Sequence, residues 1–325
     1  MKKGMFWMSV FAVLFAAAVQ VMAAQGGKYP SRPIRFIVPY SVGGTSDLVG
    51  RLVGAKLTEE LGVQLVVDNR GGAGSTLGTT LVAEANPDGY TIILNNIGLA
   101  VNETLRPKRA YVALRDLAPV SIVGFTPSVL IVNNNLPYKS IQDFVAAAKA
   151  QPGKIAFGSA GAGSSTHLSM AYFMSIAGIQ LHHVPYKGGG PAVRDAIAGN
   201  VQCVMVPIPT VFGHIKAKRL RPLGVSGSKR SPVLPDLPTI SEAGVAGYEF
   251  NTWYGILAPA KTPKAVIARL NTAVVQGMKD PKVREKLLAT GLDPQPSTPG
   301  QFADLIRSET ARWKKVIEDA GIPKV

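Results

Sequence analysis

The sequence predicts an α/β protein with two domains. Short apolar, β-branched runs alternate with helical patterns along the whole chain, which is typical of α/β architecture with largely parallel sheets. A chain of 325 residues is long enough to bury two separate cores. The apolar segment at 120–132 is interrupted at Thr126 and Pro127, and we interpret this break as the place where the chain passes from one domain to the other.

The amino-terminal half shows one helix among several strands. Its apolar runs predict strands at 34–39, 64–68 and 91–94 and a helix at 46–61 that Gly62 ends. In the middle of the chain, Ser140 and Asp143 predict a capping box for a helix that ends near Gly153. The alternation then continues with strands at 154–157, 182–186, 201–206 and 221–226 and helices at 164–177 and 191–198.

The carboxyl-terminal part returns to the first domain. A late strand at 253–258 precedes three helices, two of which have Pro263 and Pro281 at the first helical position, and the third begins at Thr298. The second domain is then an insertion in the first. We predict domain 1 at 25–125 and 251–325, and domain 2 at 126–250.

The first residues predict export. Lys2 and Lys3 precede an apolar stretch at 6–21, and Ala23 and Ala24 supply small residues for cleavage, which is the layout of a signal peptide at 1–24. An uncleaved anchor is the alternative, although the stretch is short for a bilayer span of about 20 residues. No cysteine follows it, so a lipid anchor is not supported.

Charge and composition exclude several classes of protein. The net charge of +15 is spread along the chain without a dense basic cluster, so nucleic acid is not the expected partner. The charge either draws anionic solutes toward a cleft or is general surface charge. Cys203 lies in the apolar run 201–208 and is expected to be a buried thiol. The histidines show no metal-ligand spacing, and no nucleotide loop or nucleophile–base pattern is present, so no cofactor, metal or catalytic role is expected.

Three segments repeat one design, in which a strand leads through a small-residue loop into a helix: 37–47, 156–167 and 184–191. Helix starts offer unpaired N–H groups and a partial positive charge, and glycines let the backbone approach a ligand. Together such loops form cradles for a carboxylate or phosphate that need no cationic side chain.

Individual side chains in these loops have two interpretations each. Asp47 either caps its own helix or fixes its loop, with a catalytic role as the weaker alternative, and Lys187 either pairs with an anion or is solvated. Tyr40 and Tyr186 either wall the cleft or lie in the core. His167, in the first turn of its helix, is expected to be structural.

A series of motifs from about residue 29 to the carboxyl terminus resembles the substrate-binding components of tripartite tricarboxylate transporters, the Bug (Bordetella uptake gene) family. The motifs are Tyr29-Pro-x-Arg-Pro-Ile-Arg35, Val38-Pro-Tyr-x-x-Gly-Gly-x-x-Asp47, Val67-Asp-Asn-Arg-x-Gly-Ala-Gly74, Pro87-Asp-Gly-Tyr-Thr91, Gly158-Ser-Ala-Gly-x-Gly-Ser-Ser-x-His-Leu168, His183-Val-Pro-Tyr-Lys-Gly-Gly189, Leu234-Pro-Asp-x-Pro-Thr239, Trp253-Tyr-Gly255 and Ala258-Pro-Ala-x-Thr-Pro263.

The resemblance implies a type II periplasmic binding protein fold, two α/β domains that close on a ligand in the cleft between them. It implies a periplasmic, non-enzymatic and monomeric protein that captures a small mono-, di- or tricarboxylate for membrane permease subunits. The loops matching 40–47 and 158–167 would grip a carboxylate through backbone amides and water, and the loop matching 186–189 would face them from the other domain. The ligand-binding residues expected on this basis are Tyr40, Ser41, Gly43, Gly44, Thr45, Asp47, Gly158, Ser159, Gly163, Ser164, Ser165, Thr166, Tyr186, Lys187, Gly188 and Pro207.

Two departures from the family pattern bear on the ligand. Val42 stands where many members have proline, and Val206 and Pro207 stand where many carry an acid that could serve a ligand amine. The missing acid favours a plain carboxylate over an amino acid. A periplasmic sensor for a signalling system would need the same cleft and is the alternative function; an exported hydrolase or isomerase is a further one.

Overall fold

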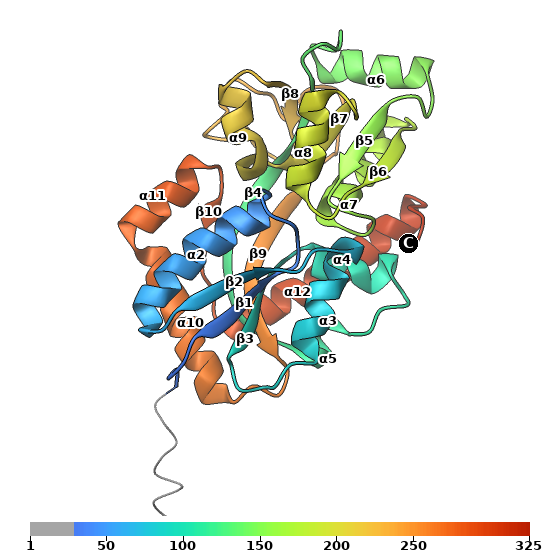
Figure 1. Cartoon of the computed structure of the whole chain (residues 1–325). Helices are drawn as coiled ribbons and strands as arrows, with labels where there is room; N and C mark the ends of the chain where they lie inside the picture. Colours follow the sequence, from blue (N-terminus) through green and yellow to red (C-terminus); the bar gives the residue numbers. More distant parts are fainter. Residues whose placement is uncertain (1–28) are drawn as a thin grey trace, which may run out of the picture.

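The computed structural model describes residues 29–325 and shows two lobes joined by long strands (Figure 1). The predicted signal peptide at 1–24 lies outside these described residues. Within 29–325, none of the helices combines the length and the apolar character that crossing a membrane requires.

Lobe 1 is built on the sheet with strand order β2-β1-β3-β9-β4, to which β10 adds beside β4. Its strands are β1 (Ile34–Val38), β2 (Leu65–Asn69), β3 (Thr91–Asn96), β4 (Leu117–Asn133), β9 (Asn251–Pro259) and β10 (Asp293–Pro294). Its helices are α2 (Thr45–Leu61), α3 (Thr76–Ala83), α4 (Gly98–Leu105), α5 (Ala113–Asp116), α10 (Lys264–Lys279), α11 (Pro281–Ala289) and α12 (Pro299–Asp319), with a 3-10 turn η1 (Ala73–Ser75).

Lobe 2 is built on the sheet with strand order β4-β7-β5-β6, to which β8 adds on the other side of β4. Its own strands are β5 (Ala156–Ser159), β6 (His182–Pro185), β7 (Cys203–Pro207) and β8 (Leu220–Val225). Its helices are α6 (Ile141–Ala150), α7 (Ser165–Ala177), α8 (Gly189–Ala198) and α9 (Ile208–Lys216).

Strand β4 belongs to both sheets. Its residues up to Pro127 pair with β9, and its residues from Ser128 onward pair with β7 and β8. The apolar interruption at Thr126 and Pro127 does not end the strand: one strand of 17 residues runs through both lobes. Pro127 lacks the N–H for a ladder bond, and it stands where β4 changes partners, with Asn251 of β9 as its register partner. The change of partner falls at the same place as the apolar interruption.

The sheets are mixed, and the expectation of largely parallel sheets is wrong. The pairs β1–β2, β1–β3, β5–β6 and β5–β7 are parallel, whereas β9 runs antiparallel to β3 and β4, and β4 runs antiparallel to β7, β8 and β10. The reason is the connection between the lobes. The chain enters lobe 2 through β4 and leaves it through β9, so these two strands run in opposite directions.

Most predicted elements lie within two residues of their expected bounds, and the helix caps explain the exceptions. The Ser140 hydroxyl accepts from the Asp143 amide at 3.0 Å, but the Asp143 carboxylate accepts from Lys139 N, so only half of the predicted capping box forms. Pro263 is the cap of α10 rather than its first residue. Thr298 and Gln301 form a complete capping box on α12. Four helices were not predicted, α3, α4, α5 and α9, because their sequences are short or rich in glycine and proline.

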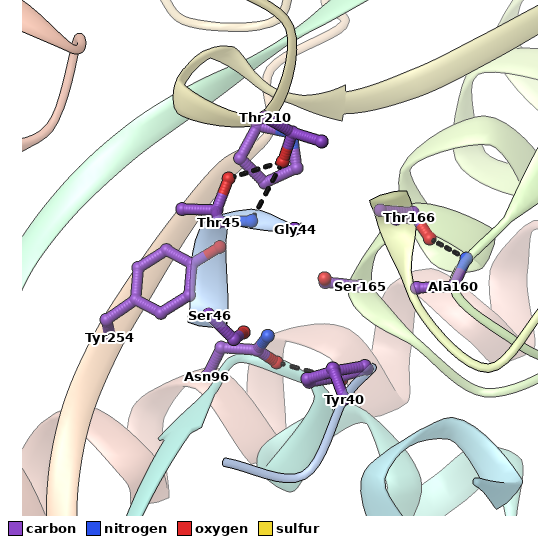
Figure 2. Close-up of a pocket in the computed structure, with 12 residues that line it drawn as sticks. Tyr40, Gly44, Thr45, Ser46, Asn96, Ala160, Ser165, Thr166, Thr210 and Tyr254 are labelled. Atoms are coloured by element: carbon purple, nitrogen blue, oxygen red, sulfur yellow. Dashed lines mark hydrogen bonds between the residues drawn. The ribbon is translucent and has the colours of Figure 1, made fainter. Parts of the chain in front are cut away.

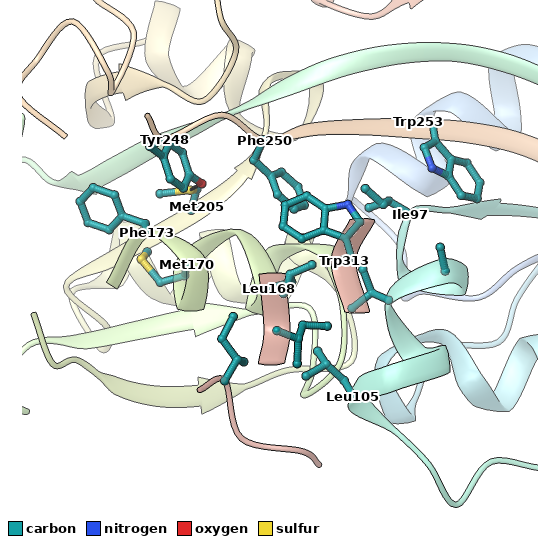
Figure 3. Close-up of a cluster of buried hydrophobic side chains, with 14 of the residues drawn as sticks. Ile97, Leu105, Leu168, Met170, Phe173, Met205, Tyr248, Phe250, Trp253 and Trp313 are labelled. Atoms are coloured by element: carbon teal, nitrogen blue, oxygen red, sulfur yellow. Dashed lines mark hydrogen bonds between the residues drawn. The ribbon is translucent and has the colours of Figure 1, made fainter. Parts of the chain in front are cut away.

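A cluster of buried aromatic and aliphatic side chains joins the lobes (Figure 3). Trp313 on α12 lies with its ring centroid 5.1 Å from that of Phe250 and 5.6 Å from that of Tyr172 on α7. Helix α12 of lobe 1 therefore packs against lobe 2.

Three histidines lie as predicted: His167 is buried, and His182 and His183 point to opposite faces of β6. His182 is exposed, and His183 stacks between Phe157 and His167, with ring centroids 4.7 and 4.3 Å away. Gly163 N donates to His167 Nδ1 at 3.3 Å, and His183 Nε2 lies 2.6 Å from Ser159 Oγ. Burial, with the Arg106 charge adding to it, lowers the pKa of His167 to about 4. Burial and the neighbouring histidines lower the pKa of His183 to about 4. Both rings are therefore neutral at pH 7.

Gly255 should tolerate no side chain. A Cβ at this position would overlap the ring of Phe302, which is fully buried, and Gly255 lies in β9 at the centre of the lobe 1 sheet. We expect Gly255→Ala to lower the free energy of unfolding by about 1–3 kcal/mol, since overpacking a rigid core costs this much. The check is the midpoint of urea unfolding.

Two further variants give the control. Gly300→Ala adds a methyl group where nothing lies within 4 Å, and it should leave the midpoint nearly unchanged. Phe302→Leu should be less damaging in the Gly255→Ala background than alone, because it removes the overlapping ring atoms. Strict additivity of the two substitutions would contradict the close packing of the Phe302 ring on Gly255.

Stability should fall as the solution is acidified from about pH 6.5 toward pH 4. The unfolded chain takes up protons at the ordinary histidine pKa of 6.5, whereas the folded chain holds His167 and His183 neutral down to about pH 4. The free energy of unfolding is therefore highest above pH 6.5. It falls as the pH drops through this window, by on the order of 3 kcal/mol for His167 alone. His167→Gln should flatten the melting temperature against pH, and His182→Gln, at an exposed ring, should not; equal slopes for both would contradict the assignment.

Candidate functional site

A small cavity of about 20 Å³ lies between the lobes (Figure 2). It is lined from lobe 1 by the start of α2 and the carboxyl ends of β1 and β3, and from lobe 2 by the start of α7 and the loops into α8 and α9. The lining residues are Tyr40, Gly44, Thr45, Ser46, Asn96, Ala160, Ser165, Thr166, Gly189, Pro207, Thr210 and Tyr254. A cavity of this size holds about one water molecule, so the lobes are drawn together.

The loop before α2 is fixed by its own aspartate. Asp47, in the first turn of α2 and only 5% exposed, accepts from Gly43 N at 3.1 Å and from Arg51 Nε at 2.9 Å. Gly43 has φ 89°, a left-handed conformation that glycine adopts without strain. The Ser46 amide, second in the helix, has no hydrogen-bond partner among residues 29–325. Ser46 is one of the residues that line the cavity.

The loop before α7 is fixed by hydroxyl groups. Thr166 Oγ1 accepts from Ala160 N at 2.7 Å, Ser159 Oγ accepts from Gly161 N at 3.1 Å, and Ser164 Oγ caps the helix by accepting from His167 N at 3.2 Å. In the part of the chain that the structure describes, the amides of Ser165 and Thr166 have no partner. Both residues line the cavity.

Two helix starts thus meet at one cavity. Each contributes free amides and the positive end of its dipole, which favour a negatively charged group. Asn96 uses its Oδ1 to accept from Gly98 N at 2.9 Å and from Tyr40 Oη at 3.3 Å, so its side-chain NH₂ is available. Figure 2 shows this NH₂ and the Ser165 hydroxyl pointing toward the same space.

The cavity lining carries no lysine, arginine, histidine, aspartate or glutamate side chain. Its titratable groups are two tyrosines. Burial raises the pKa of Tyr40 to about 12 and raises that of Tyr254 further above its usual range. Both hydroxyls therefore stay protonated at neutral pH, and that of Tyr40 donates its proton to Asn96 Oδ1. The cavity suits an anion held by neutral donors and helix ends.

The lobes are held together by backbone contacts between glycine-rich loops. Ser41 N donates to Lys187 O at 3.0 Å, and Thr45 N donates to Thr210 Oγ1 at 3.0 Å. A Cβ at Gly188 would lie 2.9 Å from Ser41 N, and one at Gly190 would lie 2.7 Å from Val42 O. Only glycine permits this approach, so the structure is a closed state.

The structure distributes the predicted site residues over three places. Those that line the cavity are Tyr40, Gly44, Thr45, Ser165, Thr166 and Pro207. Those that shape the loops or join the lobes around it are Ser41, Gly43, Asp47, Gly158, Ser159, Gly163, Ser164 and Gly188. Tyr186 and Lys187 line a separate hollow with Arg106, where the Tyr186 hydroxyl donates to Asp195 Oδ2 at 2.6 Å and the Lys187 side chain is exposed.

The sequence analysis missed six lining residues: Ser46, Asn96, Ala160, Gly189, Thr210 and Tyr254. Asn96 ends β3 and is followed by Gly98 at the start of α4, which repeats the strand–loop–helix design, but α4 was not predicted. Thr210 was missed for the same reason on α9. Tyr254 lies in the middle of a strand, and only the arrangement of β9 beside β3 brings it to the site.

The described residues show no metal site and a buried thiol. Among residues 29–325, no three His, Cys, Asp or Glu side chains lie together as metal ligands would. Cys203 is fully buried, as predicted, and its Sγ lies 3.8 Å from Ala156 O. Burial raises the pKa of this thiol well above its usual range, so it is not a nucleophile at neutral pH.

Comparison with known proteins identifies the family. The family model described as "Tripartite tricarboxylate transporter family receptor" matches residues 49–322. Protein BugT of Bordetella pertussis is 36% identical over 316 residues, which cover 97% of this chain and 97% of BugT. The periplasmic binding protein BugD has a solved structure with a TM-score of 0.89, 32% identity, and coverage of 91% of this chain and 100% of that one.

Two further solved structures were determined with carboxylates bound. Rpa4515 of R. palustris with adipate has a TM-score of 0.89 and 34% identity, covering 92% of this chain and 100% of that one. MatC from Rhodopseudomonas palustris with bound malate has a TM-score of 0.86 and 31% identity, covering 89% and 100%. The expected periplasmic binding protein fold is therefore confirmed, and the chain belongs to the tripartite tricarboxylate transporter receptor family, the Bug family of periplasmic solute-binding proteins.

Proposed function

We propose that this protein captures a small carboxylate between its lobes and presents it to the membrane permease subunits of a tripartite tricarboxylate-type transporter. The observation that carries this proposal is that Ser46, Ser165 and Thr166, whose amides have no hydrogen-bond partner among residues 29–325, line one cavity whose lining includes no cationic side chain. A carboxylate can accept from several N–H groups at once, and each such charge-assisted bond contributes about 1.5–3 kcal/mol.

The relatives support the same class of ligand. MatC holds malate and Rpa4515 holds adipate, and both share the fold of this chain at more than 30% identity. These ligands differ in length but share the carboxylate group. We infer that the two helix starts bind the carboxylate and that the remaining lining residues select the rest of the molecule.

The ligand that fits best is a plain carboxylate. A ligand with an ammonium group needs an acid in the site, and the lining residues include none. Pro207 lines the cavity at the position where many members carry such an acid. An amino acid would therefore leave its charge unpaired on closure.

Ligand entry requires the lobes to separate, since the closed cavity is far smaller than a dicarboxylate. We place the moving bodies at 25–125 with 251–325 and at 126–250. The change of partner on β4 between Pro127 and Ser128 and the pairing of Pro127 with Asn251 support a hinge there. On closure the Ser41–Lys187 and Thr45–Thr210 bonds would form and exclude water.

The cellular setting follows the family. The protein acts in the periplasm as a monomer after export by its signal peptide, and it binds its ligand without converting it. The buried thiol of Cys203 and the neutral site without an acid–base pair support the absence of catalysis.

The Ser165 amide provides a sharp test. Ser165 is the first residue of α7, where proline is favoured, and Ser164 before it is extended at φ −76° and ψ 164°, which proline accepts. Ser165→Pro therefore removes the N–H while preserving the helix. We expect the Kd for malate or adipate, measured by calorimetry, to rise about 10- to 150-fold, the equivalent of one charge-assisted bond.

The matched control is Ser165→Ala, which keeps the amide and removes only the hydroxyl. It should weaken binding less than Ser165→Pro does. The melting temperature of both variants without ligand should match that of the unchanged protein. We refer to the cavity lined by Ser46, Ser165 and Thr166 as the amide cradle. If Ser165→Pro folds and binds as tightly as the unchanged protein, the amide cradle is not the carboxylate site.

Pro207 tests the choice of ligand. Asp and Asn both cap helix starts well, so Pro207→Asp and Pro207→Asn should each preserve α9. The Asp variant places a negative charge in the site, and we expect it to bind malate about tenfold or more weakly than the Asn variant. The unchanged protein should be stabilised in a thermal-shift screen by plain carboxylates and not by aspartate or glutamate. Selective stabilisation by an amino acid would contradict the proposed ligand class.

A further inference from the structure

A second cavity, of about 540 Å³, lies beside the hinge. It is separate from the amide cradle, since the two share no lining residue. Phe125 and Pro127 of β4 line it where that strand passes between the lobes. Lobe 2 adds the loop that contains Lys229 and Val233, and lobe 1 adds Leu288 and Leu292 from α11 and the turn after it. We refer to it as the hinge cavity.

The lining of the hinge cavity combines apolar surface with positive charge. Leu288 is one of few large apolar side chains that remain exposed, at 40%. Lys229 has no ion-pair partner among residues 29–325, and Arg230 pairs only with Glu242. The carboxylate of Asp293 is already paired with Arg284 at 3.5 Å and accepts from Gln295 Nε2 at 2.7 Å. The unbalanced charge in the cavity is therefore positive.

These features match a ligand of one kind. Cavities of about 300–1,000 Å³ hold small organic molecules, usually on apolar walls with few polar contacts. An anion with an apolar body would pair with Lys229 and cover Leu288, Phe125 and Val233. A fully polar dicarboxylate would give the apolar side chains of the cavity no apolar surface to pack against.

The hinge cavity is connected to the amide cradle through the start of α9. A Cβ at Gly291 would lie 2.8 Å from Ile208 Cγ2 and 3.1 Å from Val233 Cγ2, so lobe 1 meets lobe 2 here without space for a side chain. Ile208 is the first residue of α9 and follows Pro207, which lines the cradle. Thr210, on the same turn, makes the bond to Thr45 that joins the lobes. Figure 1 shows α11 on the flank of lobe 1, below α9 of lobe 2.

We propose that the hinge cavity is a second ligand site for a small amphipathic anion, and that its occupant favours the closed state. Both lobes build the cavity in the closed arrangement, so an occupant that fits it binds this arrangement better than an open one. It then raises the affinity of the cradle for its own ligand, and by linkage the cradle ligand raises the affinity of the hinge cavity by the same factor. The existence of the second site does not depend on the proposed function, whereas its coupling to the cradle ligand rests on that function.

The site itself can be tested with 1-anilinonaphthalene-8-sulfonate, an aromatic anion whose fluorescence rises in apolar surroundings. Titration of the folded protein should show one saturable site. Lys229→Glu and Leu288→Ser should each raise its Kd at least about tenfold. The matched controls are Lys264→Glu and Leu77→Ser, which change exposed residues outside the hinge cavity and should leave the Kd unchanged. Equal Kd values for all four variants, or loss of fluorescence by simple competition with malate, would overturn the proposal.

The coupling can be tested by calorimetry with malate at zero and at saturating probe. The Kd for malate should fall about five-fold or more with the probe present, and this change should vanish in Lys229→Glu, which leaves the cradle intact. An unchanged or raised Kd would overturn the coupling. If malate and other carboxylates do not bind at all, the proposed function fails, whereas the fluorescence titration still decides whether the hinge cavity is a site.

Discussion

The cavity between the lobes is shaped by two helix starts whose first backbone amides the helices themselves cannot satisfy. An α-helix leaves its first N–H groups without partners, and here two helix starts, those of α2 and α7, direct theirs at one small space. The surrounding hydroxyl and carboxylate groups are engaged in holding the loops: Asp47 on Gly43, Thr166 on Ala160 and Ser164 on His167. In the function we propose, the ligand's carboxylate meets this uncharged set of donors, which the loop contacts hold in place.

The cradle exists only while the lobes are closed, and the chain provides two features for that. One is β4, which runs through both sheets and so fixes how the lobes turn against each other. The other is the contact of glycine-rich loops, where Gly188 and Gly190 let the backbone of lobe 2 reach Ser41 and Val42. On the far side, Trp313 and Phe250 keep the lobes in contact. In the function we propose, the lobes separate on the cleft side, and the hinge cavity lies beside the strands that join them.

The sequence predicted much of the fold because its signals are local. Gly62 ended α2, Thr298 with Gln301 began α12, and Ser164 capped α7, all by contacts within a few residues. The direction of the strands was predicted less well. Whether β9 lies parallel or antiparallel to its neighbours depends on where the chain returns from lobe 2, and no pattern inside the strand records that.

For the site too, the sequence predicted the local features and not the long-range ones. The strand–loop–helix segments at 37–47 and 156–167 already specify that free amides, glycines and hydroxyl groups occur together, since these follow from chain chemistry alone. The sequence could not assign Asn96, Thr210 and Tyr254 to the cradle, nor separate Lys187 from it, because these placements depend on which strand ends and which lobe surfaces meet. By itself, then, the sequence determined the local elements and the type of chemistry; only the tertiary structure decided which groups share a cavity, because long-range packing and strand order bring them within contact distance.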